Sequence, residues 1–587
     1  MAETPKTKDL LYEIGRLKKQ VAELKTTKAY GLVWEDKPEK FDAEAENALP
    51  VLQEKGGKFK DIELDPSSGH NVLIEGDNYH ALSVLNYTHS GKIDVIYIDP
   101  PYNTGAADWK YNNDYVDVND TFRHSKWLSF MSKRLELAKN LLKSTGIIVV
   151  TIDDYEIATL RLLMNDIFGL ENYLGTVAIR NNPSGRSTVS GFSVNHEYAL
   201  FYSRTSAAKI GRLPHNEEQV SRYKEKDENG YFEWENFRKN GTDSDRADRP
   251  KQFYPLVINK STHKLRVPKI RWNTPERKYD FHDKLEKNEE VVLPINDGNE
   301  KVWKFGLERM STVVDELLVK RKNGVFELYR KKYLSEDGSL PRTWWDKPGY
   351  SARDNGTRTL TEILGVNNKF DFPKAPDAVE DCIRVANAPS NGILLDFFAG
   401  SGTTGHAVLE MNKMDGGNRS FILCSNNENS ICEDVTYERV KQVMKGYTKA
   451  SKEKVAGLGG NLKYLKTAFV AKHVEYGLTD EARLDLTRRA NLLLALKENT
   501  FTPVESADRY EVFSSPSCVT GIYFTEDKVQ LDEMLKSLKT KARGKTVVVY
   551  IFSWEKGSYK AGFEDYPDFH FEDIPEPILD VYRSIGY

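Results

Sequence analysis

The stretch Gly392-Ile-Leu-Leu-Asp-Phe-Phe-Ala-Gly-Ser-Gly-Thr-Thr-Gly405 is an aliphatic run that leads directly into a glycine-rich loop. The aliphatic part, 392–398, predicts a buried strand, and the residues from about His406 onward predict a helix. The three glycines of the loop let the backbone turn tightly and approach a ligand without a clash from Cβ. Amide groups at the start of the helix point into the same space. The pattern indicates a ligand-binding turn, with a plain strand–helix connection as the alternative.

Around this loop, buried strands alternate with helices. Helices are predicted over 79–87, 125–142 and 155–168, and residues 35–65 are expected to be irregular. Near-continuous aliphatic strands separated by helices are typical of a parallel sheet that is covered on both faces. The predicted fold class is therefore α/β, a Rossmann-like doubly wound sheet. The further strands that support it lie at 71–77, 92–98, 146–152, 175–179 and 419–424.

The composition restricts the class of protein. The 587 residues are 39% hydrophobic and 29% charged, which is enough for several cores, and the formal net charge is −4. A nucleic-acid surface would therefore be a local basic patch. No run reaches the roughly 18 apolar residues of a membrane span, and the polar start lacks a secretory core. The four cysteines form no Cys-x-x-Cys pair, so no metal site is expected and a reducing cytoplasm fits best.

The pattern divides the chain into five parts. The first contains an apolar stripe from Leu11 to Leu24, typical of an amphipathic helix that either docks on its own domain or contacts a second copy or a partner. The third mixes basic, aromatic and turn residues and interrupts the sheet pattern, so it is expected to be an inserted domain. The predicted parts are the helix at 1–28, the sheet domain at 29–204 and 366–447, the insertion at 205–365, and a separate C-terminal α+β domain at 448–587.

A second loop, Asp99-Pro-Pro-Tyr102, ends the strand predicted over 92–98. Ligands of open α/β sheets bind outside the carboxyl ends of the strands. A carboxylate at such a position can accept a hydrogen bond from an exocyclic amine. The prolines fix the backbone and leave the Pro100 carbonyl as a second acceptor, and the Tyr102 ring offers a face for a planar base. The loop alone would also fit a rigid turn with a capping aspartate, but two such loops in one sheet favour a shared site.

Together, Asp99-Pro-Pro-Tyr102 and Phe398-x-Gly400-x-Gly402 resemble the amino-group DNA methyltransferases that use S-adenosyl-L-methionine. The order of the two loops, with an insertion between them, is similar to the β arrangement of that family. The segments Tyr30–Glu35 and Gly459–Tyr464 resemble modification subunits of type III restriction–modification systems. Smaller matches to the family are Gly76-Asp77-Asn78, Asn182-Pro183, His196-Glu197-Tyr198 and Phe370–Lys374.

The resemblance implies a role for each matching residue. Asp99, Pro100, Pro101 and Tyr102 would form the catalytic loop, in which an adenine flipped out of the duplex is stacked and its N6 amine accepts the methyl group. Hydrogen bonds to that amine would stabilise the charge that develops during attack. The ribose hydroxyls of the cofactor would be bound by Asn426 or Glu428. The remaining cofactor-binding residues would be Asp77, Phe372, Lys374, Asp396, Phe398, Gly400, Gly402 and Thr403.

Two absences narrow the substrate. C5-cytosine methylation needs a cysteine nucleophile, usually after proline, and the chain has no Pro-Cys. The family's N4-cytosine enzymes more often carry serine at the position of Asp99, so adenine N6 is the expected target. His196 is expected to be structural rather than catalytic. In the insertion, the residues that would read DNA are Arg246, Arg249, Lys251, Phe253 and Tyr254. The alternative is that these basic residues form an ordinary solvated surface.

The function implied is the modification and recognition subunit of a type III restriction–modification system. Its expected partners are double-stranded DNA, a restriction subunit and a second copy of the chain. An orphan methyltransferase, or a recognition subunit that hardly methylates, remains the alternative. No phosphate-binding loop is present, since the one Gly-Lys-Thr, 544–546, has Lys539 in place of the upstream glycine. ATP hydrolysis would therefore require another polypeptide.

Overall fold

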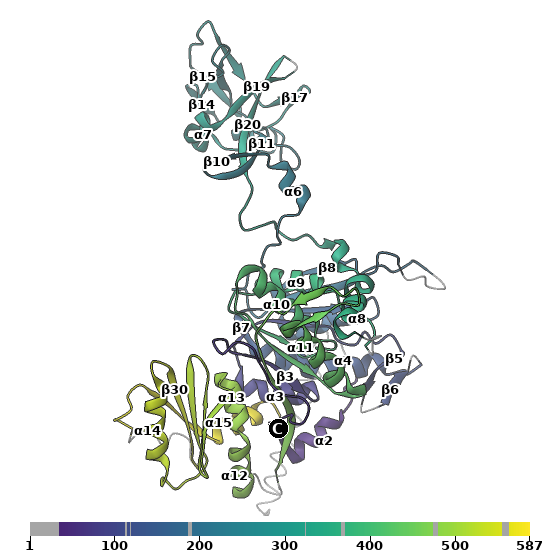
Figure 1. Cartoon of the computed structure of the whole chain (residues 1–587). Coiled ribbons are helices and arrows are strands. Elements are labelled where there is room, and N and C mark those ends of the chain that lie inside the picture. The colour runs from purple at the N-terminus through teal and green to yellow at the C-terminus, as the bar shows by residue number, and fades with distance from the viewer. Residues whose placement is uncertain are drawn as a thin grey trace, which may run out of the picture. The chain divides into compact units, whose positions relative to one another are not determined.

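The computed structural model describes residues 34–111, 114–117, 119–185, 191–322, 324–365, 370–472, 479–554 and 563–586. The helix predicted at 1–28 lies outside the described residues. The described chain forms two compact units, of which one contains the residues up to Gly211 and those from Pro341 onward. The other unit is Arg212–Leu340, and both are shown in Figure 1.

A mixed sheet, with eleven strands among the described residues, organises the first unit. Antiparallel β1 (Ala48–Glu54) borders one end, and β9 (Glu197–Ser203) and β8 (Tyr173–Ile179) follow the other. β21 (Trp344–Trp345) pairs with β8, and β2 (Ile62–Glu63) pairs with β26. Its central strands are parallel and lie in the order β26 (Asn461–Ala471), β3 (His70–Glu75), β23 (Ser420–Ser425), β22 (Ile393–Asp396), β4 (Ile93–Ile98) and β7 (Leu142–Ile152).

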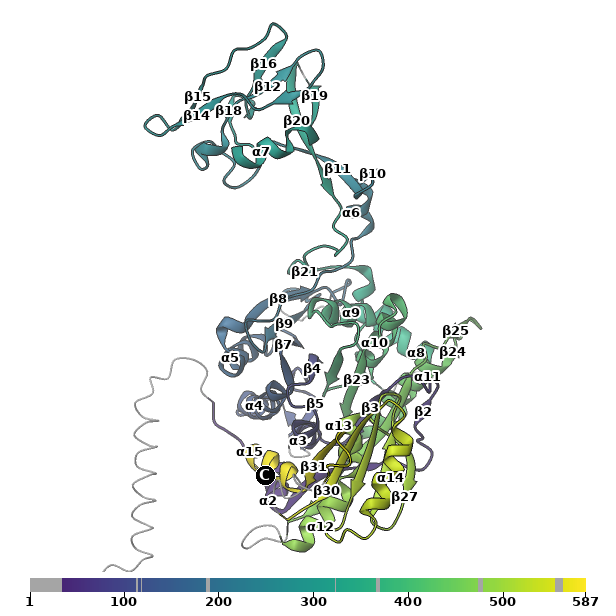
Figure 2. The same ribbon diagram turned by 90° about the vertical axis from the view of Figure 1, so that its left-hand side faces the viewer.

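Helices cover both faces of this sheet, as Figure 2 shows. One face carries α3 (Asn78–Thr88), α4 (Arg123–Leu141) and α5 (Ile157–Phe168). Because the central strands are buried from both sides, they need the aliphatic runs that the sequence contains. The predicted doubly wound α/β fold is confirmed, and no described helix is long and apolar enough to cross a membrane. The other face carries α9 (Pro376–Val385), α10 (Thr403–Asp415) and α11 (Glu438–Lys445).

The ends of the first unit differ from the expectation. Residues 35–65 are not irregular throughout, since they contain α2 (Lys40–Asn47) and β1. β1 pairs with β26, which lies beyond the expected domain boundary at 447/448. The main sheet therefore continues past that boundary, because the chain returns to it for one more parallel strand beside β3.

The C-terminal residues are also less separate than expected. They form a second sheet with two antiparallel and two parallel pairings, flanked by helices. Leu493 of α13 and Ile578 of α15 belong to the same buried cluster as Leu85 of α3, so this part shares the core of the first unit. Its elements are α12 (Asp480–Arg489), α13 (Asn491–Glu498), β27 (Thr502–Ser506), β28 (Tyr510–Ser514), β29 (Cys518–Tyr523), α14 (Leu531–Ala542), β30 (Thr546–Phe552), β31 (Phe569–Ile574) and α15 (Glu576–Ser584).

The second unit is mainly β structure around a core of its own, and it is narrower than the predicted insertion, 205–365. Residues after Leu340 return to the first unit because β21 extends the main sheet and α8 (Arg358–Leu364) packs against α11. The elements of the second unit used below are β12 (Leu256–Asn259), β14 (Ile270–Asn273), β15 (Lys278–Phe281) and the 3-10 turn η2 (Pro250–Gln252).

Two aromatic residues of the second unit do not lie on its surface. The sequence suggested Phe253 and Tyr254 beside the basic residues of a possible DNA-contacting surface, but both side chains are buried. Tyr254 packs in the core with Leu256, and its hydroxyl donates a hydrogen bond to the Phe305 carbonyl. The two aromatic side chains are buried because the chain enters β12 just after them.

Candidate active site

The two predicted loops leave neighbouring strands. β4 and β22 are parallel and adjacent, with Val95 opposite Leu394 and Ile96 opposite Leu395. Asp99 therefore emerges beside the start of the glycine loop, although the insertion separates the two segments in the sequence. A carboxyl edge of this kind is where α/β sheets bind ligands.

Asp99 is held through one of its two carboxylate oxygens. Its Oδ1 accepts hydrogen bonds from the Thr151 hydroxyl at 2.6 Å and from the Tyr102 hydroxyl at 2.8 Å. The ammonium of Lys374 lies 3.0 Å from the same atom. None of the described residues donates a hydrogen bond to the other oxygen, Oδ2. The carboxylate is thus fixed in orientation while one oxygen remains available to an outside donor.

The backbone of this loop is also anchored. The Trp127 indole donates a 2.7 Å hydrogen bond to the Pro101 carbonyl. Asn103, with a left-handed φ of 56°, donates from its side-chain amide to Glu156 at 2.6 Å. Among the described residues, none donates to the Pro100 carbonyl. Two acceptors, the Pro100 carbonyl and Asp99 Oδ2, therefore stand one residue apart on a rigid loop.

A buried carboxylate that was not predicted as a site residue completes this arrangement. Glu197 begins β9, is 2% exposed, and accepts hydrogen bonds at Oε2 from Asn181 at 2.7 Å and from Tyr102 at 3.0 Å. The sequence did contain a sign of this role, because Glu197 is a carboxylate at the first position of an otherwise apolar strand, within the segment His196-Glu197-Tyr198. The neighbouring His196 contacts the Tyr198 hydroxyl at 2.9 Å, and its structural role stays a prediction.

Lys374 joins the two loops. Its ammonium lies 2.7 Å from Glu197 Oε2 and also donates to the Tyr102 hydroxyl, while its carbonyl accepts from Thr403 at 3.5 Å. Burial alone would lower the pKa of Lys374, but the carboxylates of Asp99 and Glu197 outweigh it and raise that pKa. The sequence placed Lys374 with the cofactor, whereas the structure commits its charge to the Asp99 loop.

Tyr102 is held as a hydrogen-bond donor. Burial raises the pKa of its phenol well above the usual value, with a further contribution from Asp99 and Glu197. The hydroxyl therefore keeps its single proton, which Asp99 Oδ1 and Glu197 Oε2 share as acceptors. The Lys374 ammonium lies 4.7 Å from the centre of the ring.

The glycine loop has the backbone that its sequence predicts. Gly400 and Gly402 have left-handed φ values of 47° and 77°. A Cβ at Gly400 would lie 2.9 Å from Cζ of Phe370, so the Phe370 ring or the loop would have to shift to accommodate another residue. Gly402 is the N-cap of α10 and has no side chain, so the amide groups of the first helical turn receive no side-chain cap from it.

A buried arginine supports this loop from below, and it was not predicted. Arg439 donates from Nη1 to the Thr403 hydroxyl at 2.7 Å and to the Ser401 hydroxyl at 3.0 Å. Burial lowers its pKa to about 10, so it remains a cation at neutral pH. The nearby Thr436 hydroxyl donates to the Gly400 carbonyl at 2.6 Å. The loop is therefore shaped by side chains from α11 and from the segment that leads into it.

Asp396, the last residue of β22, is buried beneath the loop. Its carboxylate accepts hydrogen bonds from the Thr404 hydroxyl at 2.5 Å and from the Phe398 amide at 2.9 Å. Burial raises the pKa of Asp396 to about 7, although these two hydrogen bonds lower it. The side chain shapes the turn from within, and Phe398 packs 5.7 Å from the Phe130 ring.

The other predicted cofactor residues lie at the same carboxyl edge or in the loop that precedes α9. Asp77 caps α3 by accepting from the Tyr79 amide at 2.7 Å and also accepts from Arg134 at 3.2 Å. Its neighbour Asn78 donates to the Phe397 carbonyl at 2.9 Å, which ties the end of β3 to the glycine loop. Phe372 is 74% exposed. Asn426 is exposed directly after β23, with Glu428 half-buried two residues later, and the role of each stays a prediction.

Comparisons with known proteins show which proteins this chain is similar to. A family model described as DNA methylase matches residues 93–268 and 264–443. The chain is 35% identical over 375 residues to type II methyltransferase M.KpnI of Klebsiella pneumoniae, covering 63% of this chain and 84% of that protein. It is 30% identical over 454 residues to the type III restriction-modification enzyme EcoPI Mod subunit of Escherichia phage P1, covering 70% and 68%. A solved complex, M1.HpyAVI–SAM, is similar over 63% of this chain and 98% of that one, at 13% identity and a TM-score of 0.30.

Proposed function

The chain belongs to the DNA methylase family, and from this premise we propose that it methylates adenine N6 at specific sites in duplex DNA. Membership confirms the expected enzyme class, a DNA methyltransferase, and with it the expected cofactor, S-adenosyl-L-methionine. We further propose that it is the modification and recognition subunit of a type III restriction–modification system. The similarity to the EcoPI Mod subunit supports this assignment.

The open acceptors at Asp99 and Pro100 are the observation that carries the proposal. An exocyclic amine of adenine has two N–H groups, and its lone pair is conjugated with the ring. Two hydrogen bonds, from these N–H groups to Asp99 Oδ2 and to the Pro100 carbonyl, would draw the amine toward a tetrahedral geometry. They would also stabilise the positive charge that develops on its nitrogen. Each such hydrogen bond contributes on the order of 2–4 kcal/mol when it is aimed at a developing charge. Because a stacked base cannot reach this loop, the adenine would be flipped out and placed against the Tyr102 ring.

The residues of the glycine loop fit the cofactor. Left-handed Gly400 and Gly402 allow close backbone approach, and the uncapped start of α10 supplies amide donors. When bound, S-adenosyl-L-methionine supplies the methyl group. Asp77, Phe398, Thr403 and Asn426 would surround it, while Asp396 keeps the turn in shape from below. Lys374 keeps the Asp99 carboxylate paired and oriented, so that Asp99 acts as an acceptor.

Cleavage and energy use belong to the proposed partner. Gly544-Lys545-Thr546 runs from the turn after α14 into the first residue of β30 and so leads into a strand, whereas a phosphate-binding loop leads into a helix. The chain would therefore need a restriction subunit to hydrolyse ATP and cut DNA. Dimerisation of this chain and residence in a reducing cytoplasm are part of the same proposal. The orphan alternative differs only in lacking the restriction subunit.

Transfer of a tritiated methyl group from S-adenosyl-L-methionine to duplex DNA tests the proposal. The wild-type chain should label DNA, and mass spectrometry of the digested product should identify N6-methyladenine. Asp99→Asn should reduce transfer by at least about a hundredfold because it removes a charged acceptor, while cofactor binding measured by calorimetry persists. Asp415→Asn is the matched control, because it makes the same substitution at the end of α10 that is far from the glycine loop. This variant should transfer the methyl group normally.

Two outcomes would redirect the assignment. N4-methylcytosine in the product would replace adenine as the target. A wild-type chain that labels no DNA, with or without a restriction subunit, would favour a recognition subunit that hardly methylates.

A further inference from the structure

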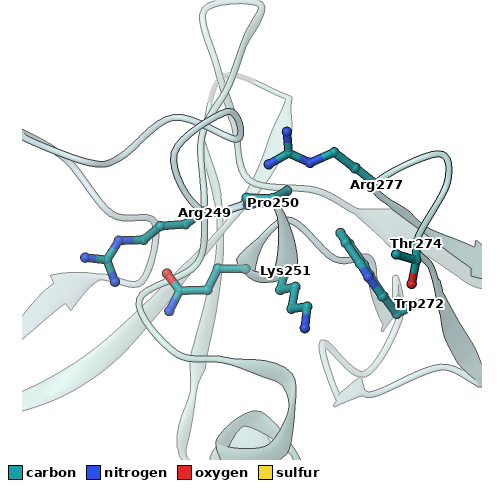
Figure 3. A pocket seen from close by; sticks show the side chains of 7 residues that line it. Arg249, Pro250, Lys251, Trp272, Thr274 and Arg277 are labelled. Atoms are coloured by element: carbon teal, nitrogen blue, oxygen red, sulfur yellow. The ribbon is translucent and has the colours of Figure 1, made fainter.

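A basic pocket of about 600 Å³ opens on the second unit, whereas the residues assigned above to methyl transfer belong to the first unit. It is formed by η2 and by the hairpin of β14 and β15. Of the described residues that line it, none is acidic and three are cationic, Arg249, Lys251 and Arg277. Figure 3 shows Trp272 and Arg277 on the hairpin side and Arg249 extending away from them. In a chain with a net charge of −4, this reverses the sign of charge locally.

The pocket has a fixed frame. Trp272 pairs with Tyr279 across the hairpin, and their rings meet edge to face at 5.0 Å. The Tyr279 hydroxyl donates to the Lys251 carbonyl at 3.1 Å, which fastens the hairpin to η2. The Gln252 carbonyl accepts from the Trp303 amide at 3.0 Å. The flat face of Trp272 is thus held in place by contacts to the core of this unit.

Two of the cations are uncommitted. In the part of the chain that the structure describes, neither Lys251 nor Arg277 forms an ion pair. Arg277 is exposed at the hairpin turn with a left-handed φ of 49°, and the Lys251 ammonium lies 5.9 Å from the Trp272 ring. The third cation, Arg249, lies 3.4 Å from Asp243 at an exposed position. Arg246, which the sequence also suggested, is instead paired with Glu300 at 2.9 Å.

One lining residue carries an unmet hydrogen-bonding requirement. The side-chain oxygen of Gln252 is buried and has no partner among the described residues. A buried acceptor without a donor costs on the order of 1–3 kcal/mol, so a rotation of the Gln252 side chain that brings its oxygen to a donor on a ligand would remove that cost. Glutamine is a residue type that forms two hydrogen bonds with adenine, one with the exocyclic N6 amine and one with the ring nitrogen N7 of the base. The pocket therefore combines phosphate-binding cations with a base-reading amide.

We propose that this pocket binds the target DNA, with Lys251 and Arg277 on backbone phosphates, Gln252 on a base edge, and Trp272 as the flat wall beside them. The proposal rests on the proposed function and adds the residues that would determine sequence specificity. Phosphate contacts position a protein on DNA without reading its sequence, whereas base contacts carry the discrimination. Substitution of the phosphate-contacting residues should therefore weaken binding to any sequence, whereas substitution of Gln252 should reduce sequence discrimination.

The cations are tested by the salt dependence of binding to a random-sequence duplex, which does not require methylation. Each lost phosphate contact should flatten the plot of log affinity against log salt concentration by roughly 0.9. The double variant Lys251→Ala/Arg277→Ala should thus flatten this slope by the amount expected for about two lost phosphate contacts. Lys278→Ala is the matched control on the same hairpin and should bind like wild type, because Glu276 already neutralises that lysine.

Gln252 is tested by sequencing the methylated sites in DNA from expressing hosts. The wild-type chain should modify one motif, and Gln252→Ala should lose on the order of tenfold in discrimination at one base position of that motif. Unchanged cofactor binding and thermal midpoint show that each variant is folded. Wild-type salt slopes for the double variant, or an unchanged motif for Gln252→Ala, would overturn the inference. If the wild-type chain methylates nothing, the proposed function fails, while the salt-slope result still decides for or against the pocket as a DNA site.

Discussion

The Lys374 ammonium lies 3.0 Å from Asp99 Oδ1, so a residue from the segment before α9 pairs with the carboxylate at the end of β4. The same ammonium lies 2.7 Å from the buried Glu197. One positive charge therefore serves two carboxylates, and its carbonyl contacts the glycine loop through Thr403. We infer that Lys374 is a positioning residue that keeps the two loops in a fixed relation.

Lys374→Met should impair both stability and methyl transfer. Removing the ammonium leaves Glu197 buried without a cation, which costs on the order of 3–5 kcal/mol in unfolding free energy. Methyl transfer at saturating cofactor should fall at least about tenfold, because Asp99 loses part of its orientation. Denaturant unfolding and kcat give the two readouts. Lys449→Met, a partly exposed lysine paired with the exposed Glu453 at 3.1 Å, is the control because it leaves no buried charge.

A double variant separates the two effects. Lys374→Met/Glu197→Gln removes the unpaired charge and should recover most of the lost stability. Its methyl transfer should stay low, since Asp99 still lacks the ammonium. Recovery of both together would show that Lys374 acts only through stability.

Gly400→Ala should weaken cofactor binding. Its left-handed φ of 47° is unfavourable for alanine, and the added Cβ would lie 2.9 Å from the Phe370 ring. We expect the dissociation constant for S-adenosyl-L-methionine to rise at least about tenfold, as the loop must shift. Calorimetry measures it directly. Gly416→Ala is the control at the far end of α10, where φ is 68° and a Cβ meets nothing within 4 Å; an equal effect there would contradict the loop-specific explanation.

Features contained in one continuous segment could be predicted from sequence. The aliphatic strand, glycine loop and helix after residue 392 are contiguous, as are β4 and Asp99, so their order and chemistry were readable. Glu197 and the Lys374 ammonium were not, because their positions depend on how β9 and the segment before α9 pack against distant strands. Tyr254 was misread for a related reason: an aromatic residue after cations looks the same whether it enters a core or faces a ligand.

Arg439→Met should loosen the glycine loop without touching the cofactor directly. The variant loses the hydrogen bonds to Thr403 and Ser401 and leaves both hydroxyls without that donor. We expect cofactor affinity to fall on the order of tenfold, equivalent to about 1.4 kcal/mol. Lys441→Met, on the same helix and paired at the surface with Glu438 at 2.9 Å, should bind normally. Wild-type affinity in Arg439→Met would remove it from the supports of the loop.

The last prediction concerns Asp396 and pH. Burial raises its pKa from 3.8 to about 7, so the folded state holds a proton that the unfolded state has released between these values. The stability contributed by protonated Asp396 is fully present below about pH 4 and is lost as pH rises to about 7. Above that, the folded protein carries a buried charge that costs on the order of 4 kcal/mol, at about 1.4 kcal/mol per pH unit.

Asp396→Asn keeps an acceptor for the Thr404 hydroxyl but does not titrate. The unfolding free energy of this variant relative to wild type should therefore rise between pH 4 and about pH 8, by up to the same few kcal/mol. Denaturant unfolding of both proteins across this range measures the difference, and the other titrating groups cancel because the two chains share them. Parallel stability curves would mean that Asp396 is ionised in the folded state throughout, so that Thr404 and the Phe398 amide outweigh its burial.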